Sequence, residues 1–422
     1  MQKIVTTLKL QLTLQEQGYS ARKRTDNLEA YDSFLRGMEY FLRTTKEANT
    51  QARQMWEKAI ALDPQYAEAY AVLGYTYWAE WVLRWSADPQ NLERALVLAQ
   101  QAIALDDSLP GAHSALSNVY TLKQQYDQAI VEGERAIALD PNNADSYASQ
   151  SLALTFAGRP EEALRAVEQA MRLNPRYPFW YLFNTGIAYR FTGQYSKAIV
   201  TLKEVISRNP NNVAAHNNLA ASYWLQWLSQ QSPAGQTLEL AVGVMQRALA
   251  LNDSWFWVHI FLGYLSLYQQ QYEQALAEME RTVALAPTVA ESYAALAEVL
   301  SRMGRTESAL AAATQALHLK NEFADDHLGS IGTVYAVSGR YDEARALLQR
   351  SLNHYPNILH IHLMLAVVYS ELGQAAEARA EATEVLRLNP NFSLEVHKQR
   401  EPIKDPAVLE RHIAALRKAG LK

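Results

Sequence analysis

The chain has 422 residues, of which 49% are hydrophobic and 20% charged, with a formal net charge of −5 at pH 7 and no cysteine. The apolar fraction can fill packed cores and excludes an intrinsically disordered chain. The lack of cysteine excludes disulfides, thiolate metal ligands and cysteine nucleophiles, and the mildly acidic balance argues against a broad nucleic-acid-binding surface. No stretch approaches the roughly 18 uninterrupted apolar residues of a membrane span, and the start lacks the pattern of a signal peptide. These features favour a cytoplasmic protein.

Residues 1–28 are predicted to form an N-terminal helix followed by a charged linker. The apolar residues of this helix recur at helical spacing, at Ile4, Val5, Leu8 and Leu12. The basic residues Arg22, Lys23 and Arg24 are too few for a nucleic-acid footprint, so we expect them to be solvated. Because the chain opens inside a helical pattern, the sequence leaves open whether it is a fragment of a longer protein.

From residue 29 to residue 392 one pattern recurs with a basic period of 34 residues. Each copy carries a Leu-Gly/Ala-plus-Tyr signature, as around Gly74 and Tyr77, and many copies carry a loop proline after Asp or Asn, as at Pro64 and Pro141. Such a proline ends one helix and precedes the next without losing a needed hydrogen-bond donor. Each copy also has an alanine where two helices would cross: Ala52, Ala95, Ala129, Ala163, Ala198, Ala241, Ala275, Ala309, Ala344 and Ala378.

This pattern resembles the tetratricopeptide repeat (TPR), in which every repeat is a pair of antiparallel helices. The resemblance implies an all-α fold, a TPR α-solenoid that winds as a right-handed superhelix of about ten helix-turn-helix repeats with capping helices. The alanines agree with this fold, because small residues at a helix crossing let two backbones approach closely.

The spacing of the repeats predicts an internal duplication. Full repeats begin at Ala67, Pro110, Ala144, Pro178, Val213, Phe256, Ala290, Ala324 and Leu359. The intervals are 43, 34, 34 and 35 residues and then the same again, so two four-repeat blocks of 146 residues, 67–212 and 213–358, follow one another in register. A degenerate first repeat at 29–66 precedes them, and a last repeat at 359–392 and capping helices at 393–422 follow.

Each block carries a nine-residue insertion, which we expect to lengthen the first helix of its repeat by about two turns. The insertions bring tryptophans with them, Trp81 and Trp85 in the first block and Trp227 in the second. Exposed Trp clusters usually mark contacts, so one interpretation is self-association into a homo-oligomer. The other is that the extended helices cover each other or a neighbouring repeat.

The TPR resemblance implies that certain positions of each first helix line an inner surface of the solenoid. These positions carry an unusual number of aromatic and Asn side chains: Tyr75, Trp78, Asn118, Phe156, Trp180, Phe183, Asn184, Ile187, Arg190, Phe191, Asn217, Asn218, Trp224, Trp257, Phe261, Tyr264 and Tyr268. Later repeats turn small or polar there, at Glu298, Arg302, Ser330 and Thr333. We interpret the aromatic stretch as a groove for a peptide or partner protein, since rings supply contact area and amides can pair with a ligand backbone. The alternative is that the rings pack against neighbouring helices.

The sequence carries no signature of catalysis, of a cofactor or of a metal site. It has no phosphate-binding glycine loop, no H-E-x-x-H and no G-x-S-x-G. Asp325, Asp326 and His327 are interpreted as the start of a helix, where Asp caps free amides. The histidines at the fourth position of their repeats, and the His354–His360–His362 group, are interpreted as structural; the former are His113, His216, His259 and His362.

The two ends of the chain resemble known bacterial contexts of TPR repeats. The segment QKIVTTLKLQLTLQ followed by RKRTDNLEAYDSFLRG is similar to the region that joins a TolB-like domain to TPR repeats. The closing segment FSLEVHKQREPIKDPAVLERHIAALRKAGLK looks like the C-terminus of bacterial class III adenylate/guanylate cyclases with TPR tails. Two functions therefore stay open: a non-catalytic protein-interaction scaffold, and a regulatory or oligomerisation tail of such a cyclase. An enzyme in its own right is disfavoured.

Overall fold

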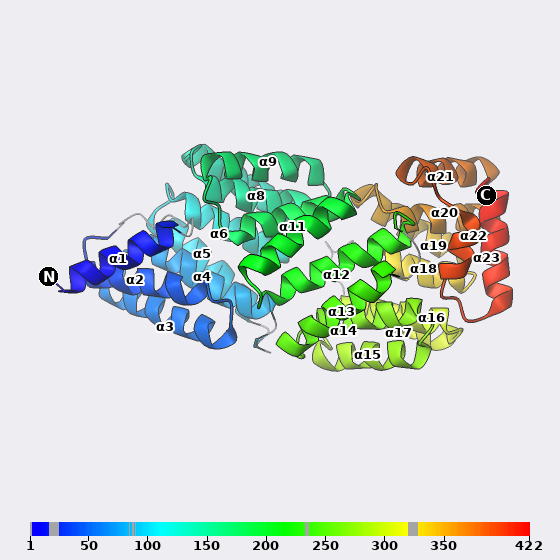
Figure 1. Ribbon diagram of the computed structural model, residues 1–422, viewed down its shortest axis with the longest axis horizontal. Coiled ribbons are helices and arrows are strands. Elements are labelled where there is room, and N and C mark those ends of the chain that lie inside the picture. Colours follow the sequence, from blue (N-terminus) through cyan, green and yellow to red (C-terminus); the bar gives the residue numbers. More distant parts are fainter. Residues whose placement is uncertain are drawn as a thin grey trace. The chain divides into compact units, whose positions relative to one another are not determined.

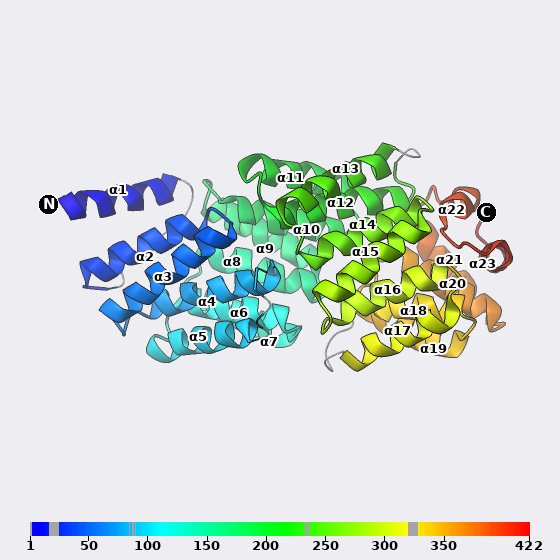
Figure 2. The same cartoon turned by 90° about the horizontal axis from the view of Figure 1, so that it is seen from below.

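The computed structural model describes residues 2–16, 25–83, 85, 86, 88, 90–232, 236–319 and 328–422. Within these ranges all 23 regular elements are α-helices, and consecutive helices pack as antiparallel pairs (Figures 1 and 2). The all-α solenoid expected from the sequence is confirmed. No helix in the described part of the chain is both long and apolar enough to cross a membrane.

The chain divides into two compact units, and the division passes through α11 and the start of α12. Unit 1 comprises residues 1–192 and 200–215, and unit 2 comprises residues 193–199 and 216–422. Helix α1 (Gln2–Glu16) opens unit 1, and five helix pairs follow: α2 (Leu28–Phe41) and α3 (Lys46–Leu62), α4 (Ala67–Val82) and α5 (Asn91–Leu105), α6 (Pro110–Leu122) and α7 (Tyr126–Leu139), α8 (Ala144–Phe156) and α9 (Pro160–Leu173), α10 (Phe179–Phe191) and α11 (Tyr195–Arg208).

Unit 2 is built from five further pairs and two terminal helices. The pairs are α12 (Val213–Leu228) and α13 (Gln236–Leu251), α14 (Phe256–Tyr268) and α15 (Tyr272–Leu285), α16 (Ala290–Arg302) and α17 (Thr306–Leu319), α18 (Leu328–Val337) and α19 (Tyr341–His354), α20 (Leu359–Glu371) and α21 (Ala375–Leu388). The terminal helices are α22 (Leu394–Arg400) and α23 (Pro406–Lys418).

The first helices begin at or next to the residues from which the repeats were counted. Pro178 is the N-cap of α10, which starts one residue later, because proline fits the extended backbone that precedes a helix. Ala324, Asp325, Asp326 and His327, like the basic residues at 22–24, lie outside the described residues.

The alanines at the predicted crossings are buried. Nine of the ten are fully buried, and Ala378 is 1% exposed. In the α4–α5 pair, a side-chain carbon added to Gly74 would lie 3.4 Å from the carbonyl oxygen of Ala95. The two backbones are therefore in contact, and larger side chains at these positions would separate the helices.

The insertions lengthen their helices less than the sequence suggested. Helices α4 and α12 have 16 residues where α6, α8, α10 and α14 have 13, a gain of about one turn rather than two. The remaining residues form the connection to the next helix, and Trp85 lies in it. Proline at 89 and 233 disfavours a continued helix, and the Asp88 side chain accepts the amide of Gln90, the residue before α5, at 2.9 Å.

In each unit, the loop after the fifth helix pair is hydrogen-bonded to the loop within the first pair. In unit 1 the Asn209 side-chain amide, after α11, donates to Thr44 Oγ1, between α2 and α3, at 2.9 Å. In unit 2 the Asn389 amide, after α21, donates to the carbonyl of Ser229, at the end of α12, at 2.7 Å. Two asparagines at equivalent loops thus join residues that lie 165 and 160 positions apart.

The terminal helices pack against the last helix pair. Helix α23 packs on α20 (Figure 1), with Ile413 and Leu416 almost fully buried and the Ser370 hydroxyl donating to the carbonyl of Ala415 at 2.9 Å. Asp405 caps the start of α23. The basic residues Arg417 and Lys418 occupy its last turn, where they complement the helix dipole.

Candidate partner-binding surface

The predicted aromatic residues of unit 1 form two small clusters on first helices. On α4 the ring of Tyr75 lies 6.3 Å from that of Trp78 and 6.4 Å from that of Phe41. Asn118 on α6 donates its side-chain amide to the Tyr75 hydroxyl at 3.1 Å. Burial raises the pKa of Tyr75 to about 12, so this phenol is neutral at physiological pH. Tyr75 and Trp78 keep part of their surface exposed.

The second cluster of unit 1 lies on α8 and α10. The rings of Phe156 and Phe191 meet edge to face at 5.7 Å, and the Arg190 guanidinium lies 4.5 Å from the centre of the Phe191 ring. Phe183 is half-buried. Three other predicted residues of this unit serve internal packing. Trp180 packs edge-on against Tyr181 at 4.5 Å, the buried Asn184 donates to the carbonyl of Ala148 at 2.7 Å, and Ile187 is buried.

Trp224 on α12 is the centre of the aromatic cluster of unit 2. Its ring lies 5.5 Å from Tyr264, stacked, 5.6 Å from Tyr268 and 6.1 Å from Phe261, all on α14. Trp257 extends the cluster, 6.5 Å from Phe261. The two predicted asparagines precede Trp224 on the same helix: Asn217 is buried, and Asn218 is half-buried.

Trp78 and Trp224 occupy equivalent positions 146 residues apart, and each has an unsatisfied hydrogen-bond donor. The indole Nε1 atom of each is buried and has no hydrogen-bond partner. An unpaired buried donor costs about 1–3 kcal/mol, so neither ring is explained by internal hydrogen bonding. The sequence could not reveal this, because it requires the positions of all neighbouring acceptors.

The tryptophans of the insertions are not free surface features. Trp81 and Trp85 are half-buried, and Trp227 is only 5% exposed. Trp227 packs edge-on against Tyr268 at 5.7 Å, and the Arg400 guanidinium lies 4.7 Å from the centre of one of its rings. Trp227 therefore offers almost no area to a second copy of the chain.

Residues 389–404, here called the C-terminal strap, return to the ends of the first helices of unit 2. Gln230, just after α12, accepts the Ser393 amide at 2.8 Å and donates to its carbonyl at 2.9 Å. The Lys404 amide donates to the carbonyl of Arg302 at the end of α16, at 2.9 Å. With Arg400 on Trp227, these contacts place a segment from the end of the chain against the end of α12, 160 to 173 residues earlier, and against Arg302, a predicted inner position.

A buried polar cluster lies where the strap meets α16. The Tyr264 hydroxyl donates to Glu298 at 3.1 Å, Glu298 lies 3.8 Å from Arg302, and Arg302 forms an ion pair with Glu401 of the strap. Arg302 is 1% exposed and Glu401 3% exposed. The sequence marked Glu298 and Arg302 as polar inner positions, but nothing in it connects them to Glu401, about a hundred residues later.

Three further histidines surround this cluster, and burial keeps them neutral. Burial, together with the positive charge of Arg302, lowers the pKa of His360 and of His397 to about 3 and that of His412 well below its ordinary value. His397 Nε2 lies 3.1 Å from His412 Nε2, and His360 Nε2 lies 3.4 Å from Thr333 Oγ1. Neither of these two contacts was predicted.

The histidines at the fourth repeat position are structural, as predicted. His113, His259 and His362 each bond through Nδ1 to a glutamate 19 residues later, at 2.6 to 2.7 Å, and through Nε2 to a carbonyl of the preceding loop. Each therefore ties both helices of its pair to one loop. His216, at the same position, is also buried. The side chain of His354 lies outside the described residues.

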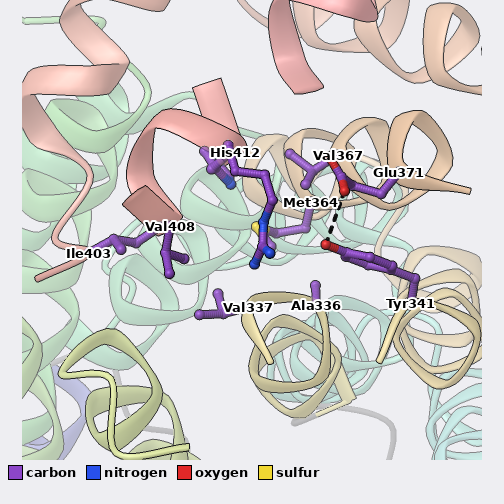
Figure 3. Close-up of a pocket in the computed structure, with 10 residues that line it drawn as sticks. Ala336, Val337, Tyr341, Met364, Val367, Glu371, Ile403, Val408 and His412 are labelled. Atoms are coloured by element: carbon purple, nitrogen blue, oxygen red, sulfur yellow. Dashed lines mark hydrogen bonds between the residues drawn. The ribbon is translucent and has the colours of Figure 1, made fainter. Parts of the chain in front are cut away.

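One pocket of about 280 Å³ lies beneath α23, between α18, α19 and α20 (Figure 3). Its wall is mostly apolar, with Met364, Val367 and Val408 among the lining residues. The Tyr341 hydroxyl donates to Glu371 at 3.2 Å on one side, and His412 forms part of the wall. The sequence did not predict it, because it is formed only where the cap meets the last repeats.

Comparison with known proteins agrees with this architecture. Family models described as tetratricopeptide repeat match residues 290–323 and 338–398, and one described as TPR repeat matches residues 186–226. The chain therefore carries tetratricopeptide repeats. The TPR matches fall in helix pairs of both units, and the solved structures below share the solenoid.

Two solved structures are similar in fold to this TPR protein. The crystal structure of the APC/C hetero-tetramer Cut9-Hcn1 matches with a TM-score of 0.51 and 17% identity, over 94% of this chain and 81% of that chain. The human IFIT1 dimer with m7Gppp-AAAA matches with a TM-score of 0.53 and 14% identity, over 90% and 94%. At such identities the likeness concerns the fold alone.

A curated relative is similar over a shorter stretch. Putative adenylate cyclase 3 of Rhizobium meliloti (strain 1021) is 33% identical over 125 residues, which is 29% of this chain. The match spans only 21% of that relative's length, so the TPR chain corresponds to a small part of it.

Proposed function

We propose that this TPR protein is a non-catalytic scaffold that binds a segment of a partner protein on the first-helix aromatic residues of unit 1. The observation that carries the proposal is the C-terminal strap. In unit 2 the strap lies against the corresponding first-helix ends, with Arg400 stacked on Trp227. A surface of this type thus accepts a chain segment when one is supplied.

The chemistry of unit 1 favours a segment with aromatic or aliphatic anchors. Tyr75, Trp78, Phe156 and Phe191 are rings with partly exposed faces, and such rings supply large contact areas with little loss of conformational entropy. Arg190 is the one predicted inner residue of this unit with a positive charge, and its guanidinium lies on Phe191. A clamp of several cations for an acidic carboxyl terminus is therefore not part of the proposal.

A peptide-selection experiment tests this. Displayed random peptides would be selected on the whole chain, and the enriched peptides measured by fluorescence anisotropy against wild type and Trp78→Ala. The matched control is Val131→Ala on α7, a residue that is 60% exposed but lies on a second helix. We expect aromatic or aliphatic anchors, a loss of affinity of about tenfold or more for Trp78→Ala, and no change for Val131→Ala.

Two results would overturn the proposal. One is enrichment of acidic-tailed peptides whose binding falls steeply with salt, which would require a cationic clamp. The other is an affinity that responds equally to both substitutions. Binding of RNA would likewise count against it, since we propose no nucleic-acid partner for a chain with a net charge of −5.

A second candidate function is a regulatory or oligomerisation tail of a multidomain bacterial cyclase. The 33% identity to putative adenylate cyclase 3 over 125 residues supports it. The test mixes this chain with the purified catalytic part of that relative and measures cyclic-nucleotide formation and sedimentation. A change in rate or in oligomeric state supports the tail function, and unchanged values for both refute it.

We also propose that the protein is cytoplasmic, bacterial and without a cofactor, and that any self-association involves Trp81 and Trp85. Both residues are half-buried: Trp81 lies in the last turn of α4, and Trp85 lies in the connection from α4 to α5. Sedimentation of the wild type and of the Trp81→Ala/Trp85→Ala variant tests this. A monomer in both cases removes self-association.

A further inference from the structure

The end of unit 2 brings two imidazoles and a carboxylate together at a buried point. His397 on α22, Glu401 just after it and His412 on α23 each offer a ligand atom, and these atoms all lie within 4.8 Å of one another. All three residues are at most 5% exposed. They come from two separate helices, which the Pro402–Pro406 turn folds against each other.

The distances match those between ligands of a tetrahedral zinc ion. Zn–N bonds of 2.0–2.1 Å at a tetrahedral angle place two ligand atoms about 3.3–3.4 Å apart. His397 Nε2 lies 3.1 Å from His412 Nε2 and 3.6 Å from Glu401 Oε2. The two rings therefore already point their Nε2 atoms at one common place, with the carboxylate beside it.

The surroundings of the three residues are those of a supported metal site. The remaining oxygen of Glu401 pairs with Arg302, which fixes the orientation of the carboxylate as outer ligands usually do. Arg302, Glu298 and Glu401 together carry one net negative charge in this buried cluster, so an added divalent cation is partly compensated. Glu401 lies between the Arg302 guanidinium and the His397 imidazole. Its negative charge would therefore separate the charge of Arg302 from that of a bound metal ion.

Three other buried histidines have hydrogen-bond partners at both ring nitrogens. In His113, His259 and His362 both ring nitrogens are occupied, one by a glutamate and one by a loop carbonyl. In His397 and His412 the Nε2 atoms face each other instead of a protein acceptor. One of these two Nε2 atoms carries the electron pair that a metal needs, and the other gains it when its proton moves to Nδ1.

We propose that His397, Glu401 and His412 bind one divalent transition-metal ion of the zinc class, with a fourth position for water. Two imidazoles and one carboxylate are ligands suited to Zn²⁺ rather than to Mg²⁺ or Ca²⁺. His412 also lines the pocket beneath α23 (Figure 3). The ion would join α22 to α23 and, through Glu401, to Arg302 at the end of α16.

The test is a titration of the whole chain after removal of metals with EDTA. Zn²⁺ binding would be measured by calorimetry, and Co²⁺ would be added as a spectroscopic probe, because tetrahedral Co²⁺ has strong visible absorption. We expect one ion per chain, a tetrahedral Co²⁺ spectrum, and no competition from Mg²⁺. His397→Gln and His412→Asn each remove one ligand and should weaken binding by about 100-fold or more. His259→Gln is the matched control and should leave binding unchanged.

Either of two outcomes overturns the proposal: wild-type chain that takes up no stoichiometric Zn²⁺ or Co²⁺, or binding that His259→Gln weakens as much as His412→Asn. The wild-type titration does not depend on a variant that folds. Far-ultraviolet circular dichroism of each variant establishes that a loss of binding follows the loss of a ligand.

Discussion

The ion pair between Arg302 and Glu401 makes a sharp prediction about the stability of the C-terminal cap. Both side chains are almost completely inaccessible, and Glu298 at 3.8 Å is the other carboxylate near the guanidinium. Glu401→Gln would keep the shape of the side chain but leave the Arg302 charge with that weaker partner. Removing one member of a buried pair typically costs about 3–5 kcal/mol. Because Glu298 remains, we expect the lower end, about 3 kcal/mol.

The assay is native-state hydrogen exchange of the α22 and α23 amides in EDTA, since repeat proteins open locally before they unfold globally. A loss of about 3 kcal/mol corresponds to exchange that is on the order of 100-fold faster. The control is Glu162→Gln. Its partner Arg159 lies at 2.6 Å, but the two side chains are 41% and 44% exposed, so we expect at most about 1 kcal/mol.

A double variant separates the ion pair from simple loss of packing. Arg302→Met/Glu401→Gln removes both charges and fills the space of the Arg302 stem, and such replacements are often neutral or stabilising. We expect the cap of the double variant to be more protected than that of Glu401→Gln alone. Equal effects of Glu401→Gln and Glu162→Gln, or a double variant worse than the sum of its parts, would refute the reasoning.

Three further outcomes can be measured by urea unfolding and hydrogen exchange. Burial lowers the pKa of His259, but its bonds to Glu278 and to a loop carbonyl raise it more, so the net pKa is raised. The stabilisation is therefore present at acid pH and lost as pH rises, and His259→Gln should destabilise more at pH 6 than at pH 9; a pH-independent effect contradicts this. The pKa values of His397 and His412 are lowered, so in metal-free chain protection of the cap should fall as pH drops below about 6.5, by up to about 1.4 kcal/mol per pH unit for each ring; constant protection to pH 4 contradicts it. Gly186→Ala would place a carbon 2.7 Å from the buried Leu202 side chain and should cost about 1–3 kcal/mol, whereas Gly243→Ala meets nothing within 4 Å and should be neutral or stabilising; equal effects would show that α10 and α11 are not in contact there.

The sequence was sufficient for the contacts that recur within helix pairs. The alanines at the crossings, the starts of the first helices and the fourth-position histidines all depend on contacts within one helix pair or with the next. Such contacts join residues fewer than about 40 positions apart, so a 34-residue pattern records them directly. The same locality explains why α23 can be recognised in the sequence, since Asp405, Pro406 and the basic last turn all belong to one helix and its cap.

Only the tertiary structure shows the contacts between the beginning and the end of each unit. Small rotations between successive pairs accumulate, and after five pairs they bring Asn209 to Thr44 and Asn389 to Ser229. The same return places Arg400 on Trp227 and Glu401 on Arg302. The repeat pattern does not encode these contacts. Each involves a residue of a loop or of the irregular C-terminal end, and each occurs once in its unit. The partner surface and the metal site that we propose both depend on such contacts, so neither could be read in full from the sequence.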